Sequence, residues 1–214
     1  MDVEQYTDDA VCFAMGLVEF APATPGDVLR LVCRPSFHPE VCVTVTPTDL
    51  VAVALRSSLW AEPSPARMPE IAEHAAVSAG EFEGLCAAFE EALAESRRPP
   101  RWVVLCDGMM ASAVRTLDGR SERSSGHAVH EEERRFVKSV LSCALSKVRS
   151  VQLRNRLSWC GWYVSSQDDP AFPVEPEPSP APPRVSRLLV LGTPDDRALF
   201  HSLHGARATV GRAK

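Results

Sequence analysis

Short apolar runs separated by turn residues fill the first quarter of the chain. Val11–Phe20 is apolar and contains Gly16, Asp27–Cys33 ends in aliphatic residues, Val41–Thr46 alternates, and Leu50–Leu55 is a further apolar run. Aliphatic and β-branched residues at a period of two favour half-buried strands. We therefore expect a strand or a short apolar segment in the first run, with a bulge at the glycine, and strands in the other three.

The hydrophobic period becomes helical after residue 77. Ser78 and Glu81 have the spacing of a capping box, and the prolines at 99 and 100 end the pattern. The apolar stripe between these limits is Phe82, Leu85, Cys86, Phe89 and Leu93, and the opposite face carries Glu83, Glu90, Glu91 and Glu95. This spacing predicts an amphipathic helix. A second, longer helix is expected to begin near His130–Glu133 and to run past Val151.

Two Asp-Gly pairs, at Asp107 and Asp118, follow a strand-like run at Arg101–Cys106. Asp-Gly is a strong hairpin signal because glycine accepts positive φ and aspartate tolerates it. The sequence therefore predicts an antiparallel meander over residues 101–129. Further along, Ser158–Tyr163 is rich in aromatic residues and is interpreted as a strand or an exposed aromatic patch.

Seven prolines between residues 168 and 184 mark a change in composition. Such a segment favours a polyproline-type linker over a packed core. We therefore expect an α+β domain at 1–167, a proline-rich linker at 168–184 and a C-terminal strand–helix appendage at 185–214. In the first domain we expect an antiparallel, meander-rich sheet with two main helices packed on one face.

Composition limits the class of protein. The chain has 214 residues, of which 45% are hydrophobic and 24% charged, as is usual for a globular domain. It has no run of the roughly 20 apolar residues that span a bilayer, and its first residues are acidic, unlike a signal peptide. The seven cysteines form no Cys-x-x-Cys pair, which favours buried thiols in a reducing compartment. We expect a cytoplasmic location.

Charge is segregated along the chain, although the net charge is only −5. Residues 1–100 hold 16 acids against 6 Lys and Arg, whereas residues 101–160 hold 6 acids against 11. This asymmetry is typical of charged faces that steer a partner. The alternative is that an acidic helix and a basic helix end pack near one another within the molecule.

A rigid turn, Arg34-Pro35-Ser36-Phe37-His38-Pro39, lies between two predicted strands. The prolines lack an amide donor and push Arg34 and His38 away from helical angles. Rigid loops on a scaffold are common sites of function. We expect His38 to stabilise the turn through a hydrogen bond or to contact a partner.

Motifs for catalysis and for cofactors are scarce. The chain has no Gly-x-Ser-x-Gly elbow, Walker loop or Gly-x-Gly-x-x-Gly, and the pairs His127/His130 and His201/His204 lack the zinc pattern with a third ligand. We therefore expect no cofactor and no metal. Nucleic acid is disfavoured as a partner because the sequence pI is about 5.7.

The order of the predicted elements resembles that of small uncharacterised bacterial proteins with a Pro-Ser-Phe-His turn. The features in that order are the strands, the turn, the amphipathic helix, Trp102, the two Asp-Gly pairs and the closing helix. The resemblance covers residues 27–145. It implies no activity and no site residues.

The hypothesis that follows is a non-enzymatic protein-binding module, with a toxin-neutralising immunity protein as one version. In that version an acidic face meets a basic toxin, which raises association rates. The candidate partner-binding residues are Glu83, Glu90, Glu91, Glu95, Arg34, His38, Trp159 and Trp162.

Two alternatives stay open. One is a subunit of a larger assembly, in which the tryptophans and the proline segment wrap a neighbour. The other is an enzyme whose site uses Arg34, Ser36, His38 and one of the turn aspartates, Asp107 or Asp118.

Overall fold

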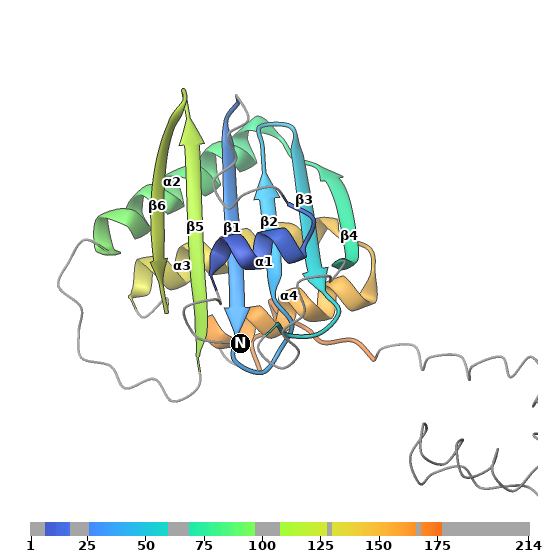
Figure 1. The fold of residues 1–214 in the computed structure, drawn as a ribbon. Helices are drawn as coiled ribbons and strands as arrows, with labels where there is room; N and C mark the ends of the chain where they lie inside the picture. Colours follow the sequence, from blue (N-terminus) through green and yellow to red (C-terminus); the bar gives the residue numbers. More distant parts are fainter. Residues whose placement is uncertain are drawn as a thin grey trace, which may run out of the picture. The chain divides into compact units, whose positions relative to one another are not determined.

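The computed structural model describes residues 7–17, 26–59, 69–96, 108–127, 130–165 and 168–176. In these ranges the chain forms a six-stranded antiparallel sheet and four helices (Figure 1). The predicted α+β fold with an antiparallel sheet is therefore confirmed. The predicted strands at 101–106 and 185–191, Asp107, and the C-terminal helix lie outside the described residues.

The sheet combines a meander with a returning hairpin. Its strands are β1 (Val28–Pro35), β2 (Val41–Val45), β3 (Asp49–Leu55), β4 (Pro69–Ala76), β5 (Met109–Leu117) and β6 (Arg120–Gly126). Their order is β4-β3-β2-β1-β5-β6. Strands β1 to β4 follow one another in space, and β5 then returns to pair with the free side of β1, with Leu31 opposite Ala113.

Helices cover both faces of the sheet. They are α1 (Asp8–Ala14), α2 (Ala79–Ser96), α3 (Glu131–Lys147) and α4 (Val151–Val164). Figure 1 shows α2, α3 and α4 behind the sheet and α1 in front of it. The larger core lies on the three-helix side and contains Leu31, Val43, Phe89, Val140 and Leu157; the smaller one, beneath α1, contains Val11, Cys12, Val32, Cys42 and Val53.

Of the two interpretations of Val11–Phe20, a strand with a bulge at Gly16 is wrong where the structure describes it, because the apolar residues there belong to the helix α1 and its end. Thr7 caps the helix α1, its hydroxyl accepting from the amide of Ala10. At the other end Gly16 has φ +75°, and the amides of Gly16 and Leu17 donate to the carbonyls of Phe13 and Cys12. This is a Schellman motif, so the glycine ends a helix. Residues 18–20 lie outside the described ranges.

The single long helix predicted past Val151 is two helices. Residues 148–150 break the helical path, and the Ser150 hydroxyl caps α4 by accepting from the amide of Leu153. The carboxylate of Glu73 on β4 accepts from the amides of Arg149 and Ser150, both at 2.8 Å. An acidic side chain from the sheet thus supplies acceptors that stop α3 from continuing into α4. Ser158–Tyr163 is part of α4 and not a strand.

Several other predictions are confirmed. Ser78 and Glu81 form the capping box of α2, with the Ser78 amide donating to the Glu81 carboxylate at 2.8 Å. Asp118 and Gly119 have φ of 49° and 73° and close the β5–β6 hairpin. Both residues have the positive φ that a type I′ turn requires.

The six cysteines in the described ranges carry free thiols, and all but Cys143 are buried. Cys12 shares a hydrogen bond with Cys42, which raises the pKa of Cys12, as burial does, and lowers the pKa of Cys42. A hydrogen bond to Cys160 and burial likewise raise the pKa of Cys33. These thiols pack as small apolar groups, as expected.

Candidate functional site

The proline-bracketed turn between β1 and β2 is fastened to the start of β5. The hydroxyl of Ser36 donates to the carbonyl of Gly108 at 2.6 Å and accepts from its amide at 3.2 Å. The amide of Ser36 also donates to the Gly108 carbonyl, at 3.0 Å. These three bonds hold the turn at one end of the sheet.

A buried carboxylate fixes the far side of the same turn. Glu40 is fully buried, and one of its oxygens accepts from the Ser58 hydroxyl at 3.2 Å. Both oxygens accept from the amide of Leu59, at 2.9 and 3.0 Å. A buried charge needs such partners. The turn is therefore positioned from both neighbouring connections before any partner binds.

The turn meets α4 through the side chain of His38 and the amide of Phe37. The rings of His38 and Trp159 stack with centroids 4.8 Å apart and planes 30° apart. Tyr163 meets His38 edge-on at 5.8 Å, and its hydroxyl lies 3.1 Å from the Nδ1 atom of His38. The same hydroxyl accepts from the amide of Phe37 at 3.3 Å. The guanidinium of Arg156 lies 4.6 Å from the centre of the Trp159 ring, in cation–π geometry.

We call these five residues, Phe37, His38, Arg156, Trp159 and Tyr163, the turn cluster. Its three α4 members stand at the i, i+3 and i+7 spacing of one helical stripe, which is why they share a face. That spacing is visible in the sequence once the segment is interpreted as a helix. Interpreted as a strand or an exposed aromatic patch, the segment does not indicate that Arg156, Trp159 and Tyr163 share one face.

Electrostatics keep the imidazole of the turn cluster uncharged. Burial lowers the pKa of His38 below its ordinary value of 6.5, and the nearby Arg156 cation lowers it further. The imidazole is therefore neutral at pH 7. The turn cluster thus presents aromatic surface with a guanidinium as its cation at that pH.

Phe37 is the most exposed part of the turn cluster. Its side chain is 69% exposed, whereas the other four members are half-buried. An exposed phenylalanine beside a Trp–Tyr–Arg group has the composition of a binding hot spot. Because prolines and main-chain bonds already fix the turn, little conformational entropy remains to be lost when it binds.

The structure brings together only some of the candidate partner-binding residues. His38 and Trp159 are in direct contact. Trp162 is half-buried beside them on α4, but its indole N–H donates to the carbonyl of Phe172 at 3.1 Å. Arg34 is buried and forms an ion pair with Asp8 at 3.1 Å. Its guanidinium therefore joins α1 to β1.

The four glutamates lie on α2, apart from the turn cluster in sequence. Glu90 pairs with Arg115 of β5 at 2.6 Å, and Glu91 pairs with Arg135 of α3. Glu95 is half-buried near the end of the helix, and Glu83 is exposed. Part of the segregated charge is therefore used within the molecule, as in the alternative of an acidic helix packed beside basic elements.

Of the enzyme alternative, Ser36, His38 and Asp118 are described, and these three side chains do not come together, whereas Asp107 lies outside the described residues. Ser36 bonds to Gly108 and not to His38. Asp118 directly follows the last residue of β5, near the start of β1, where Val28 pairs with Thr116. His38 follows the other end of β1, where Pro35 pairs with Met109. Among the described residues, no group of three or more His, Cys, Asp or Glu side chains could hold a metal ion.

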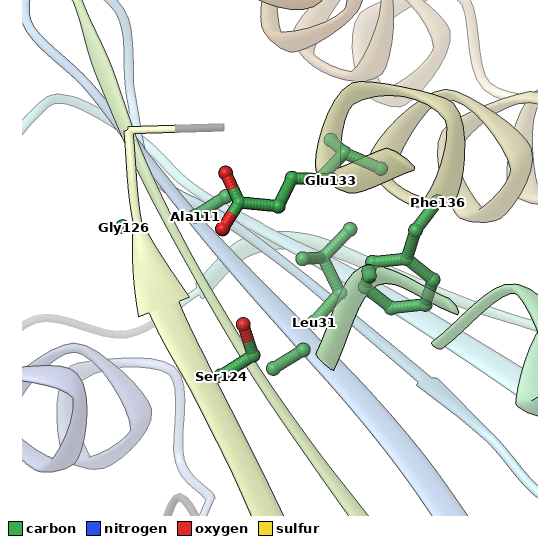
Figure 2. A pocket seen from close by; sticks show the side chains of 9 residues that line it. Leu31, Ala111, Ser124, Gly126, Glu133 and Phe136 are labelled. Carbon is green, nitrogen blue, oxygen red and sulfur yellow. The ribbon is translucent and has the colours of Figure 1, made fainter. Parts of the chain in front are cut away.

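A small cavity lies between the sheet and α3 (Figure 2). It measures about 20 Å³, and Figure 2 shows the Glu133 carboxylate directed towards β6, with Leu31 and Phe136 alongside. That volume suits about one water molecule, because a single water needs roughly 10–15 Å³. The Glu133 carboxylate accepts from the amide of His130 at 3.3 Å, so it serves the start of α3. This cavity does not fit a substrate.

No helix in the described ranges has the length and the apolar character needed to cross a membrane. The chain matches no protein-family model, no curated protein and no solved structure.

Proposed function

We propose that the protein is a protein-binding module whose contact surface is the turn cluster. The observation that carries the proposal is the 69% exposure of Phe37 on a turn that is rigidly held beside Trp159 and Tyr163. Exposed large aromatic residues are enriched at interfaces, and the rigid backbone lowers the entropic cost of association. The complementary partner surface is an apolar pocket for Phe37 with a carboxylate near Arg156.

The narrower version of the proposal is a toxin-neutralising immunity protein, in which the acidic face of α2 meets a basic toxin. The ion pairs of Glu90 and Glu91 reduce the charge that this face has left for a partner. The turn cluster, whose most exposed member is the uncharged Phe37, is therefore the surface on which the proposal rests. The identity of the bound protein distinguishes a toxin from an assembly subunit.

The test compares two exposed phenylalanines. Phe37 is 69% exposed in the turn cluster, and Phe13 is 65% exposed on α1, on the other side of the sheet (Figure 1). Wild type, Phe37→Ser and Phe13→Ser are each tagged and used to capture proteins from lysate of the native cell. We expect a stoichiometric partner with wild type and with Phe13→Ser, and at least a tenfold loss with Phe37→Ser.

Binding of the purified partner is then measured by titration calorimetry, with Trp159→Ala as an independent change in the same cluster. A partner that binds all variants equally, or that is lost only with Phe13→Ser, would contradict the proposal. Circular dichroism on each variant confirms that the fold is retained.

A further inference from the structure

Residues 168–176 pack along α4, and we call this segment the strap. It begins with a turn, in which the amide of Phe172 donates to the carbonyl of Asp169 at 3.0 Å, and continues without regular structure over 173–176. The segment falls within the proline-rich region 168–184 that the sequence assigns to a linker. Its direction is opposite to that of the helix, since Phe172 contacts Gly161 while Glu175 contacts Asn155. The strap therefore folds back over the helix that precedes it in the chain.

Phe172 anchors the strap in a slot made by a glycine. Its ring is fully buried, and a Cβ atom added to Gly161 would lie 2.2 Å from it. No side chain other than hydrogen fits this position without displacing the ring. A buried phenylalanine side chain contributes roughly 1.5–3 kcal/mol from its apolar area. The slot therefore selects a large flat side chain on the segment that fills it.

Three polar side chains of α4 bind the main chain of the strap. Trp162 donates to the carbonyl of Phe172, and the Ser158 hydroxyl donates to the carbonyl of Pro173 at 2.7 Å. Asn155 makes a two-way contact with Glu175, donating to its carbonyl and accepting from its amide, both at 2.8 Å. The three helix positions follow i, i+3 and i+7, so they form one continuous row.

Ion pairs hold both ends of the strap. Asp169 pairs with Lys138 of α3 at 2.9 Å, and the carboxylate of Glu175 accepts from Arg154 at 2.8 Å. Bonds to the main chain of Phe172, Pro173 and Glu175 fix the path of the occupant, whereas the slot and the two cations select its side chains. Peptide-binding grooves divide affinity and specificity in this manner.

We propose that the groove along α4 is a recognition site for Phe-Pro-x-Glu segments of other proteins, which the strap occupies in the free chain. The contacts that would bind such a segment are those already made to the strap: the Gly161 slot, the Asn155 and Ser158 row, and Arg154. Because the strap is joined directly to the end of α4, its local concentration is of the order of millimolar. A partner segment must therefore displace it.

The probe is a fluorescein-labelled synthetic peptide with the sequence of residues 168–176, and binding to the full chain is followed by fluorescence anisotropy. Phe172→Ala empties the slot, so we expect saturable binding to this variant and binding at least tenfold weaker to wild type. A peptide with serine in place of its phenylalanine should not bind. Asn155→Leu added to Phe172→Ala should weaken binding of the first peptide at least tenfold.

Phe172→Ala removes core packing, so its fold is checked by circular dichroism. A second variant, Glu175→Pro, leaves Phe172 in place and removes both the amide that donates to Asn155 and the carboxylate held by Arg154. We expect its affinity for the peptide to lie between those of wild type and Phe172→Ala. If neither variant binds the peptide at millimolar concentration, or if the serine peptide binds as well, the groove is only an internal packing surface.

Discussion

At the scale of single residues, Arg115 shows how one polar side chain can connect three elements. It follows Met109, Ala111 and Ala113 on the helix-facing side of β5, and it is 8% exposed. Its guanidinium pairs with Glu90 of α2 at 2.6 Å and with Glu122 of β6 at 2.5 Å.

The same guanidinium donates to the carbonyl of Cys86 at 3.3 Å and lies 5.4 Å from the centre of the Phe89 ring. The two partner carboxylates are 63% and 41% exposed. If the arginine is removed, both carboxylates return to water. The cost is therefore smaller than for breaking a fully buried pair.

Arg115→Ala should lower the free energy of unfolding by about 2 kcal/mol, from lost hydrogen bonds and lost packing against Phe89. The measurement is equilibrium urea unfolding, followed by tryptophan fluorescence. Arg120→Ala, an exposed arginine at the start of β6, is the control and should change the free energy by less than about 0.5 kcal/mol. Equal effects in the two variants would show that Arg115 is not a connecting residue.

At the scale of elements, the sequence predicts best what is encoded locally. The capping box and apolar stripe of α2 lie within a single segment, and the Asp118-Gly119 turn is specified by two residues. β4 has few β-forming residues in Pro69–Ala76, and pairing with β3 makes it a strand. That pairing is non-local, so no property of the segment alone predicts it.

The second half of α4 is not predicted as a helix because its side chains contact three different surroundings. Leu153 and Leu157 face the core, Trp159 faces the turn, and Trp162 faces the strap. Such a helix has no polar face and no simple amphipathic period. His38 and Trp159 were each identified as candidate site residues, but their contact depends on the packing of α4 against the end of the sheet.

Two glycine-to-alanine changes test the assignment of the helix ends. Gly16 has φ +75° at the end of α1, so alanine there is strained, and Gly16→Ala should destabilise the protein by about 1 kcal/mol. Gly84 lies inside α2 with open space around its Cα, so Gly84→Ala should stabilise the protein by about 0.5–1 kcal/mol. Thermal unfolding of both variants gives the signs. A rise in melting temperature for Gly16→Ala would contradict the Schellman ending.

At the scale of the whole molecule, two carboxylates, Glu81 and Asp169, join elements to one another. The hydrogen bond from the Ser78 amide and, to a smaller extent, the Lys147 cation of α3 lower the pKa of Glu81 from 4.5 to about 2. A bond from the amide of Ala171, and then Lys138, lowers the pKa of Asp169. Both groups are held more strongly when ionised, so both favour the folded state only while they carry charge.

The sign of the pH effect follows from these directions. A carboxyl whose pKa is lower in the folded protein stabilises it fully above its ordinary pKa, and the stabilisation is lost as the pH falls towards the folded value. The free energy of unfolding should therefore decrease between pH 5 and pH 2. Glu81→Gln should flatten part of this slope, measured by urea unfolding at each pH. An unaltered slope in Glu81→Gln would contradict the assignment.

The pairing of β1 with β5 has a consequence for synthesis of the chain. β1 can pair with β2 as soon as β2 has been synthesised. Its other edge pairs with β5, which leaves the ribosome only after β3, β4 and α2. At ordinary translation rates that interval is of the order of ten seconds. During it, the nascent chain carries an unpaired edge of what becomes a central strand, and such an edge is a template for pairing with another chain. The half-made chain on the ribosome, rather than the finished protein, is the form most exposed to aggregation.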